Sequence, residues 1–136
     1  MDRSTFDAYL SCFNRRDYDG LLRFWSEDFT VAFAGYTFRG ARDFIGFYRF
    51  LHHYVAESIA VYEFLSNDRL VVLEARVRLE GRVNLTPEIL KTAGYERIVP
   101  VPVGQVVEIP QFIHYHLEGG KFASVVCAIS AEPRVL

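Results

Sequence analysis

The fold is decided by residues 105–130, which read QVVEIPQFIHYHLEGGKFASVVCAIS. β-branched and aromatic residues fill both halves of this stretch, and Glu-Gly-Gly lies between them. Such a pattern is typical of two strands joined by a tight turn. The sequence therefore predicts a long hairpin, with a strand over 105–117, a turn at 118–120 and a return strand over 121–130.

One face of this predicted hairpin is almost entirely apolar. Successive side chains of a strand point to opposite faces, so every second residue shares a face. The apolar face carries only two polar groups, Gln111 and the hydroxyl of Tyr115, among Val107, Ile109, Ile113, Leu117, Val125, Cys127 and Ile129. A buried polar group is costly without a partner. These two groups therefore either complete an internal network or face a cavity, and we favour a cavity.

Upstream of the hairpin, the spacing of apolar residues is first helical and then strand-like. Ser4, Asp17 and Thr86 are the expected N-caps of helices, because each precedes an apolar helical stripe or a Pro at the first helical position. Gly94 is the expected C-cap of the last of these helices. The predicted helices cover 4–16, 17–25, 41–55 and 86–93, and the predicted strands 29–34, 37–39, 57–65 and 70–80.

This order, with helices first and strands later, is typical of the α+β class. We expect one domain over residues 1–136. In it, a cone-shaped, strongly curved antiparallel sheet wraps around three N-terminal helices, and the helix at 86–93 is a short insertion. A pocket would lie between the helices and the sheet. The inserted segment is either a lid over the mouth, with Gly81 and Gly94 as hinges, or a plain surface insertion.

Composition argues against several classes of function. Apolar residues make up 51% and aromatic residues 15% of the chain, which suits a core wrapped around an apolar pocket. The net charge of -2 and the lack of a basic stripe argue against nucleic-acid binding. Cys12 and Cys127 have neither metal-ligand nor disulfide-framework spacing, which favours a reducing, cytoplasmic setting. We expect no membrane association, because the chain has no apolar h-region at its start and no long apolar run.

Five motifs resemble the nuclear-transport-factor-2-like superfamily, which includes ketosteroid isomerases and SnoaL-like polyketide cyclases. The motifs are AYL at 8–10, NRRDYDGLL at 14–22, WSEDFTV at 25–31, RGARDFIGFY at 39–48 and EGGKF at 118–122. This resemblance implies the cone fold. It says little about function, because one fold hosts many chemistries.

The resemblance implies that one half of a ketosteroid-isomerase site is present. Tyr9 matches the tyrosine that hydrogen-bonds the developing enolate oxygen, and Tyr48, after a Phe, matches its supporting tyrosine. The carboxylate base of those enzymes has no counterpart, because Phe33 stands at its position. The second, protonated acid is also missing, and Ile113 is the nearest match. Steroid isomerisation by that mechanism is therefore not expected. The alternative for both tyrosines is a core role with satisfied hydroxyls.

Two residues are candidates for the missing proton carrier. His52 lies one turn after Tyr48 on the same predicted helix, although a structural histidine near a helix C-terminus is the simpler interpretation. Glu63 would share an inward face with Ile59 if its strand is regular, and a bulge would turn it toward water. His114 and His116 alternate like a metal pair, but without a third ligand we expect no metal site there.

The sequence thus predicts a protein that binds a small hydrophobic molecule in the cone and needs no cofactor. As an enzyme it would be an isomerase, cyclase or hydratase, and the alternative is a non-catalytic ligand-binding or dimerisation module. We expect a homodimer through the outer sheet face, where apolar residues such as Phe112 and Val126 gather. The expected ligand contacts are Phe13, Trp25, Phe33, Phe47, Leu73, Gln111, Ile113, Tyr115 and Ile129.

Overall fold

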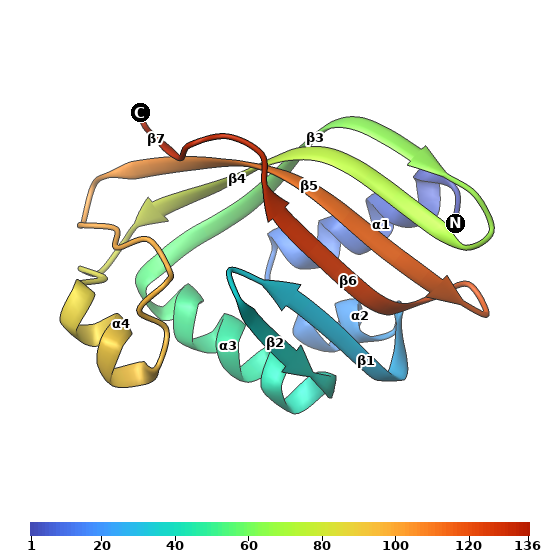
Figure 1. Ribbon diagram of the computed structural model, residues 1–136, viewed down its shortest axis with the longest axis horizontal. Coiled ribbons are helices and arrows are strands. Elements are labelled where there is room, and N and C mark those ends of the chain that lie inside the picture. Colours follow the sequence, from blue (N-terminus) through green and yellow to red (C-terminus); the bar gives the residue numbers. More distant parts are fainter.

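The computed structural model describes all residues from 1 to 136. Its helices and strands are arranged as a curved sheet that encloses helices on its inner side (Figure 1). In chain order the elements are α1 (Arg3–Asn14), α2 (Tyr18–Leu22), β1 (Trp25–Phe33), β2 (Tyr36–Arg39), α3 (Gly40–Tyr54), β3 (Val55–Ser66), β4 (Leu70–Gly81), α4 (Pro87–Ala93), β5 (Val106–Glu118), β6 (Lys121–Ile129) and β7 (Arg134–Val135). The predicted α+β cone is confirmed.

The sheet is mixed rather than wholly antiparallel, which corrects one part of the expectation. Its strand order is β2-β1-β6-β5-β4-β3, and the short β7 pairs with β5. All pairs are antiparallel except β1 with β6, which run parallel. The direction of β6 is set by its hairpin with β5. Since a long stretch of chain separates β1 from β6, no tight turn imposes an antiparallel arrangement on that pair.

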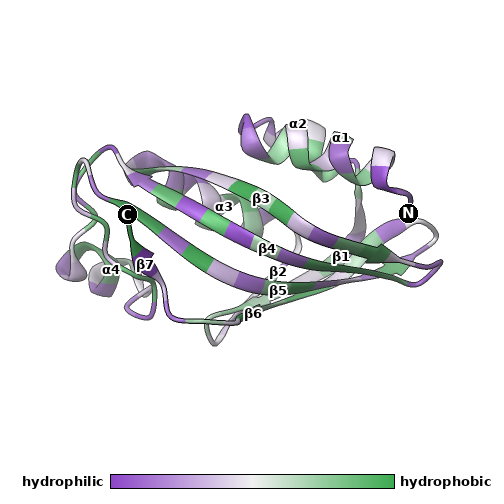
Figure 2. Cartoon of the chain, turned by 90° about the horizontal axis from the view of Figure 1, so that it is seen from above, coloured by the Kyte–Doolittle hydropathy of each residue, from purple (hydrophilic) through white to green (hydrophobic).

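The alternation predicted for the long hairpin is present in β5. Every second residue of this strand, from Val107 to Leu117, is buried, and the residues between them are partly or fully exposed. Figure 2 shows the resulting stripes of hydrophobic and hydrophilic residues along β3, β4 and β5. The inner face of the sheet packs on α1 and α3 and forms one continuous core with them.

Two helix boundaries differ from the prediction. Asp2, and not Ser4, is the N-cap of α1, and its side chain accepts a hydrogen bond from the backbone N–H of Thr5. The second helix ends at Leu22, so Trp25 lies on β1 instead of on that helix. Trp25 is pulled into the strand because its indole packs among core aromatic rings, with Phe29 at 4.5 Å and Phe44 at 4.9 Å between ring centroids.

The inserted segment between β4 and β5 is a packed part of the fold. The predicted caps of α4 are confirmed, since the Thr86 side chain accepts from the Ile89 N–H and Gly94 has φ of 84°. Leu85, Leu90, Ile98 and Val101 are all buried. At its base, a side chain on Gly81 would collide with the carbonyl oxygen of Pro102. Gly81 is therefore required for close backbone approach, and the structure gives no support for a hinge at this position.

None of the helices is both long and apolar enough to cross a lipid bilayer.

Candidate functional site

A cavity of about 180 Å³ lies between the helices and the inner face of the sheet, and most of the side chains that line it are apolar. An apolar cavity of about 150 Å³ is large enough to hold benzene. Tyr9 and Tyr48 line the cavity, and so do the expected ligand contacts Phe13, Trp25, Phe33, Phe47, Gln111, Ile113, Tyr115 and Ile129. Eight of the nine residues expected to contact a ligand therefore line the cavity.

Leu73 is an exception among the expected ligand contacts. Its side chain is completely buried, but it does not line the cavity. β4 reaches the cavity farther along, through Val77 and Leu79. Leu73 pairs with Ile113 across the sheet and belongs to the solid core beside the cavity. Alternation identified the correct face of β4, but it does not show how far the cavity extends along the strand.

The expected inward orientation of Glu63 is wrong. The register between β3 and β4 shifts between Val61 and Glu63, and a bulge of this kind turns the following side chains to the other face. Glu63 is exposed and lies outside the cavity. The carboxylate that does reach the cavity is Glu57, six residues earlier on the same strand.

Glu57 and His52 form a buried pair at the junction of α3 and β3. His52 Nε2 lies 2.6 Å from Glu57 Oε2, and the side chains are only 3% and 7% exposed. His52 itself does not line the cavity, whereas Glu57 does. The carboxylate thus faces the cavity while the imidazole stands behind it. This arrangement can hold a carboxylate in one orientation toward a bound molecule.

A second hydrogen bond fixes the imidazole from the other side. The hydroxyl of Tyr18, the first residue of α2, lies 2.7 Å from His52 Nδ1. Because a carboxylate can only accept, Nε2 donates to Glu57, and in a neutral ring Nδ1 then accepts from the Tyr18 hydroxyl. The Arg16 guanidinium donates to the backbone carbonyls of His52 and Val55 and ties this junction to the end of α1.

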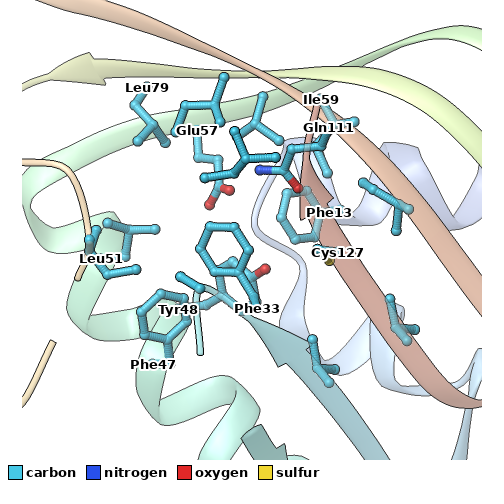
Figure 3. A pocket seen from close by; sticks show the side chains of 18 of the residues that line it. Phe13, Phe33, Phe47, Tyr48, Leu51, Glu57, Ile59, Leu79, Gln111 and Cys127 are labelled. Carbon is cyan, nitrogen blue, oxygen red and sulfur yellow. The ribbon is translucent and has the colours of Figure 1, made fainter. Parts of the chain in front are cut away.

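Gln111 presents an unused polar group to the same space. The residue is only 4% exposed, and its side-chain amide makes no hydrogen bond within the protein but opens onto the cavity. Figure 3 shows the Gln111 amide, the Glu57 carboxylate and the Tyr48 side chain directed toward a common space, with Phe33 beside them. An amide without a partner in an apolar site costs about 1–3 kcal/mol. A bound molecule with a polar atom would remove that cost.

Three tyrosines line the cavity. Burial raises the pKa of Tyr9, Tyr48 and Tyr115 well above the usual value, and the charge of Glu57 raises the pKa of Tyr48 further. The three hydroxyls are therefore protonated at neutral pH and can donate hydrogen bonds. The indole N–H of Trp25 is enclosed next to this cluster and has no aligned acceptor.

Cys127 is the one thiol on the cavity wall. Burial, followed by the nearby charge of Glu57, raises its pKa to about 12. We expect native Cys127 to react with iodoacetamide at pH 8 about a thousandfold more slowly than an ordinary thiol, because only the thiolate attacks. Peptide mass spectrometry would follow Cys127 separately from Cys12, with the urea-unfolded chain as the control. Rapid alkylation of the native protein would contradict the expectation.

The mouth of the cavity is formed by the insertion and the chain after β6. Arg97, Ile98 and Val99 line the cavity from the insertion, and Pro133 does so from the C-terminal segment. The backbone N–H of Arg97 donates to the Tyr36 hydroxyl at 3.0 Å, which fastens the insertion to the β1–β2 turn. The insertion thus supplies part of the cavity wall.

No group of three or more His, Cys, Asp or Glu side chains lies close enough together to hold a metal ion.

Glu57 is the main residue that sequence reasoning missed, although a signal for it was present. Glu57 lies two residues before Ile59, so alternation already placed it on the inward face to which Glu63 was assigned. The bulge after Val61 interrupts that alternation for Glu63 but not for Glu57. The contact with His52 gives no sequence signal, because it spans the end of a helix and the start of a strand.

The α+β cone with a cavity between its helices and sheet is a fold that the chain shares with nuclear-transport-factor-2-like proteins. The chain belongs to the SnoaL-like domain family, whose model matches residues 6–125. The resemblance noted in the sequence is thereby confirmed. No curated protein shows significant sequence similarity to the chain.

Solved structures with this fold include proteins of different activities. A proposed polyketide cyclase from Pseudomonas putida KT2440 has a TM-score of 0.73 and 21% identity, over 92% of this chain and 88% of that chain. A second one, from Xanthomonas campestris, has a TM-score of 0.72 and 23% identity, over 90% and 84%. An epoxide hydrolase from Mycobacterium tuberculosis has a TM-score of 0.67 and 13% identity, over 92% and 79%. At such identities the likeness shows the fold alone.

Proposed function

We propose that the protein is a cofactor-independent enzyme that moves a proton on a small hydrophobic molecule with a carbonyl or hydroxyl oxygen. The reaction would be an isomerisation, a cyclisation, or the addition or removal of water. One observation carries this proposal: a buried carboxylate, Glu57, opens onto an apolar cavity while His52 holds it from behind at 2.6 Å. A positioned carboxylate in an apolar site is suited to general acid–base catalysis.

The groups around Glu57 suggest how the proton would move. Glu57 would remove a proton from a carbon next to a carbonyl group. The negative charge that develops on the carbonyl oxygen would be stabilised by the Gln111 amide N–H and the Tyr48 hydroxyl, which face the same space. The protonated Glu57 would then return its proton to another atom of the substrate. In this role Glu57 replaces the base that is missing at Phe33, and His52 is a positioning residue.

A probe with a readily removed proton tests the proposal without knowledge of the natural substrate. 5-Nitrobenzisoxazole opens to a coloured cyanophenolate when a base removes its C3 proton and its N–O bond breaks. We expect the protein to accelerate this reaction and Glu57→Gln to lower kcat/KM about a hundredfold. Glu63→Gln, on the same strand but exposed, is the matched control and should leave the rate unchanged.

If the Glu57→Gln variant retains the wild-type rate, the catalytic assignment fails. A cavity that still binds the probe would then favour the alternative, a non-catalytic ligand-binding module.

We place either function in a reducing setting such as the cytoplasm, which is consistent with two free cysteines.

We also propose that the protein forms a homodimer through the outer face of its sheet. Phe112 and Val126 are 46% and 49% exposed there, and they lie on the adjacent strands β5 and β6. Light scattering after size exclusion should give twice the chain mass of 15.7 kDa, and Phe112→Glu should give a monomer. Val83→Glu is the control, since Val83 is 44% exposed but lies in the inserted segment and not on the sheet. A wild-type monomer would contradict the proposal.

A further inference from the structure

Only two of the residues that line the cavity carry a formal charge at neutral pH, Glu57 and Arg97. Glu57 is paired with His52, and the pair is buried at the α3–β3 junction. Arg97 lies at the mouth and is exposed. No carboxylate of the protein lies within ion-pair distance of its guanidinium, whose only side-chain hydrogen bond goes to the backbone carbonyl of Gly35 at 3.2 Å. The cavity therefore has one cation with no counter-charge.

The position of the Arg97 side chain is defined by its neighbours. Its guanidinium lies over the ring of Tyr36, 5.5 Å from the centroid, and its backbone N–H donates to the hydroxyl of the same tyrosine. It also lies directly against Gly35, where a side chain would displace Nη1 from its present position. Gly35 has φ of +81°, a backbone conformation that favours glycine. The β1–β2 turn thus forms a seat that holds the guanidinium at the cavity mouth.

The seat leaves most of the guanidinium free to bind a ligand. Arginine has five N–H donors arranged in a planar fork, and the Gly35 carbonyl occupies only one side of that fork. A free fork is suited to a carboxylate, which it can bind through two parallel hydrogen bonds. A carboxylate would be disfavoured near Glu57, because like charges in an apolar site repel. A ligand with one carboxylate would therefore place it at the mouth and its neutral part inside.

We infer that Arg97 binds a carboxylate of the ligand, and that the ligands of this cavity are hydrophobic acids with one or two rings. This inference rests on the proposed function only in that a hydrophobic molecule occupies the cavity. It adds the chemical class of that molecule and the direction in which it enters. The neutral end would meet Glu57, Gln111 and Tyr48, where the proposed chemistry takes place.

Calorimetric titration with two matched probes tests the inference. 2-Naphthoate carries the carboxylate, and methyl 2-naphthoate has the same rings without the charge. We expect naphthoate to bind more tightly than the ester, and Arg97→Gln to weaken naphthoate about fivefold to tenfold with no effect on the ester. The preference should also weaken with added NaCl in the wild type but not in the variant. Arg97→Lys should keep part of the preference for naphthoate over the ester, because the positive charge is kept.

Arg82→Gln is the matched control, since Arg82 is an exposed arginine of the same inserted segment that does not line the cavity. Equal binding of the two probes, or a naphthoate preference that survives in Arg97→Gln, would overturn the inference while the pocket remains a ligand site. If neither probe binds the wild type, both this inference and the ligand-binding part of the proposed function fail. Loss of activity in Glu57→Gln with an unchanged naphthoate preference would leave the role of Arg97 standing.

Discussion

Replacing His52 with Ala should lower the free energy of unfolding by about 3–5 kcal/mol. The substitution removes the partner of the Glu57 carboxylate, whose side chain is only 7% exposed, and leaves that charge without its 2.6 Å hydrogen bond. It also removes the acceptor of the Tyr18 hydroxyl. Removing the hydrogen-bond donor of a buried carboxylate costs more than the bond itself contributes, because the remaining charge stays desolvated. Urea denaturation of the wild type and of His52→Ala would measure the difference in the free energy of unfolding.

A double-mutant cycle separates the charge from the lost packing. Glu57→Gln keeps an acceptor for His52 Nε2 and removes the charge, so this variant should lose only about 1 kcal/mol. In the Glu57→Gln background, His52→Ala should then cost clearly less than it does in the wild type. A loss below about 1 kcal/mol for His52→Ala alone would mean that water in the cavity solvates Glu57 as well as the imidazole does.

Replacing Phe122 with Ala should also destabilise the fold by about 3–5 kcal/mol. Phe122 is completely buried at the start of β6, and its ring centroid lies 4.7 Å from that of Tyr115, 4.8 Å from Tyr9 and 5.1 Å from Trp25. The substitution removes a whole ring from a close-packed aromatic cluster, and the neighbouring rings can fill the space only in part. Thermal and urea denaturation would both report the loss.

The matched control for Phe122 is Leu65→Ala, since Leu65 is 72% exposed on β3. Surface substitutions of this kind usually change stability by less than about 0.5 kcal/mol. A loss below about 1 kcal/mol for Phe122→Ala would contradict the tight packing of the cluster. Because Tyr9 and Trp25 also line the cavity, the same variant should enlarge it and weaken the discrimination between ligands of different shape.

The parts of the structure that could be predicted are those in which local chemistry determines the outcome. Alternation identified the buried face of β5 from Val107 to Leu117, and cap residues identified the ends of α4. Trp25 was assigned to the wrong element, because an apolar residue just after a short helix has helical spacing whether or not the helix continues. Its true environment depends on Phe44 and Phe122, which lie far away in the sequence.

The apolar wall of the cavity could be predicted from the sequence, but the contacts between its candidate catalytic residues could not. The residues that line the cavity can be predicted from the apolar faces of the strands and helices. The Glu57–His52–Tyr18 contacts, in contrast, depend on the angle between α3 and β3 and on where α2 crosses behind them. The β1–β6 pairing is similarly non-local, since strands joined through a long intervening chain carry no turn signal for their direction.

The ends of the inserted segment are joined to each other. The N–H of Gly81 donates to the carbonyl of Gln105 at 2.9 Å, and the N–H of Gly104 donates to the carbonyl of Gly81 at 3.0 Å. The inserted segment, residues 82–103, thus leaves the sheet and returns to it at the same place, as a tight turn would. The length of its exposed parts can therefore vary while β4 and β5 keep their register. Its buried residues Leu85, Leu90, Ile98 and Val101 belong to the common core, so a change in the insertion that reaches them also changes the packing around the cavity.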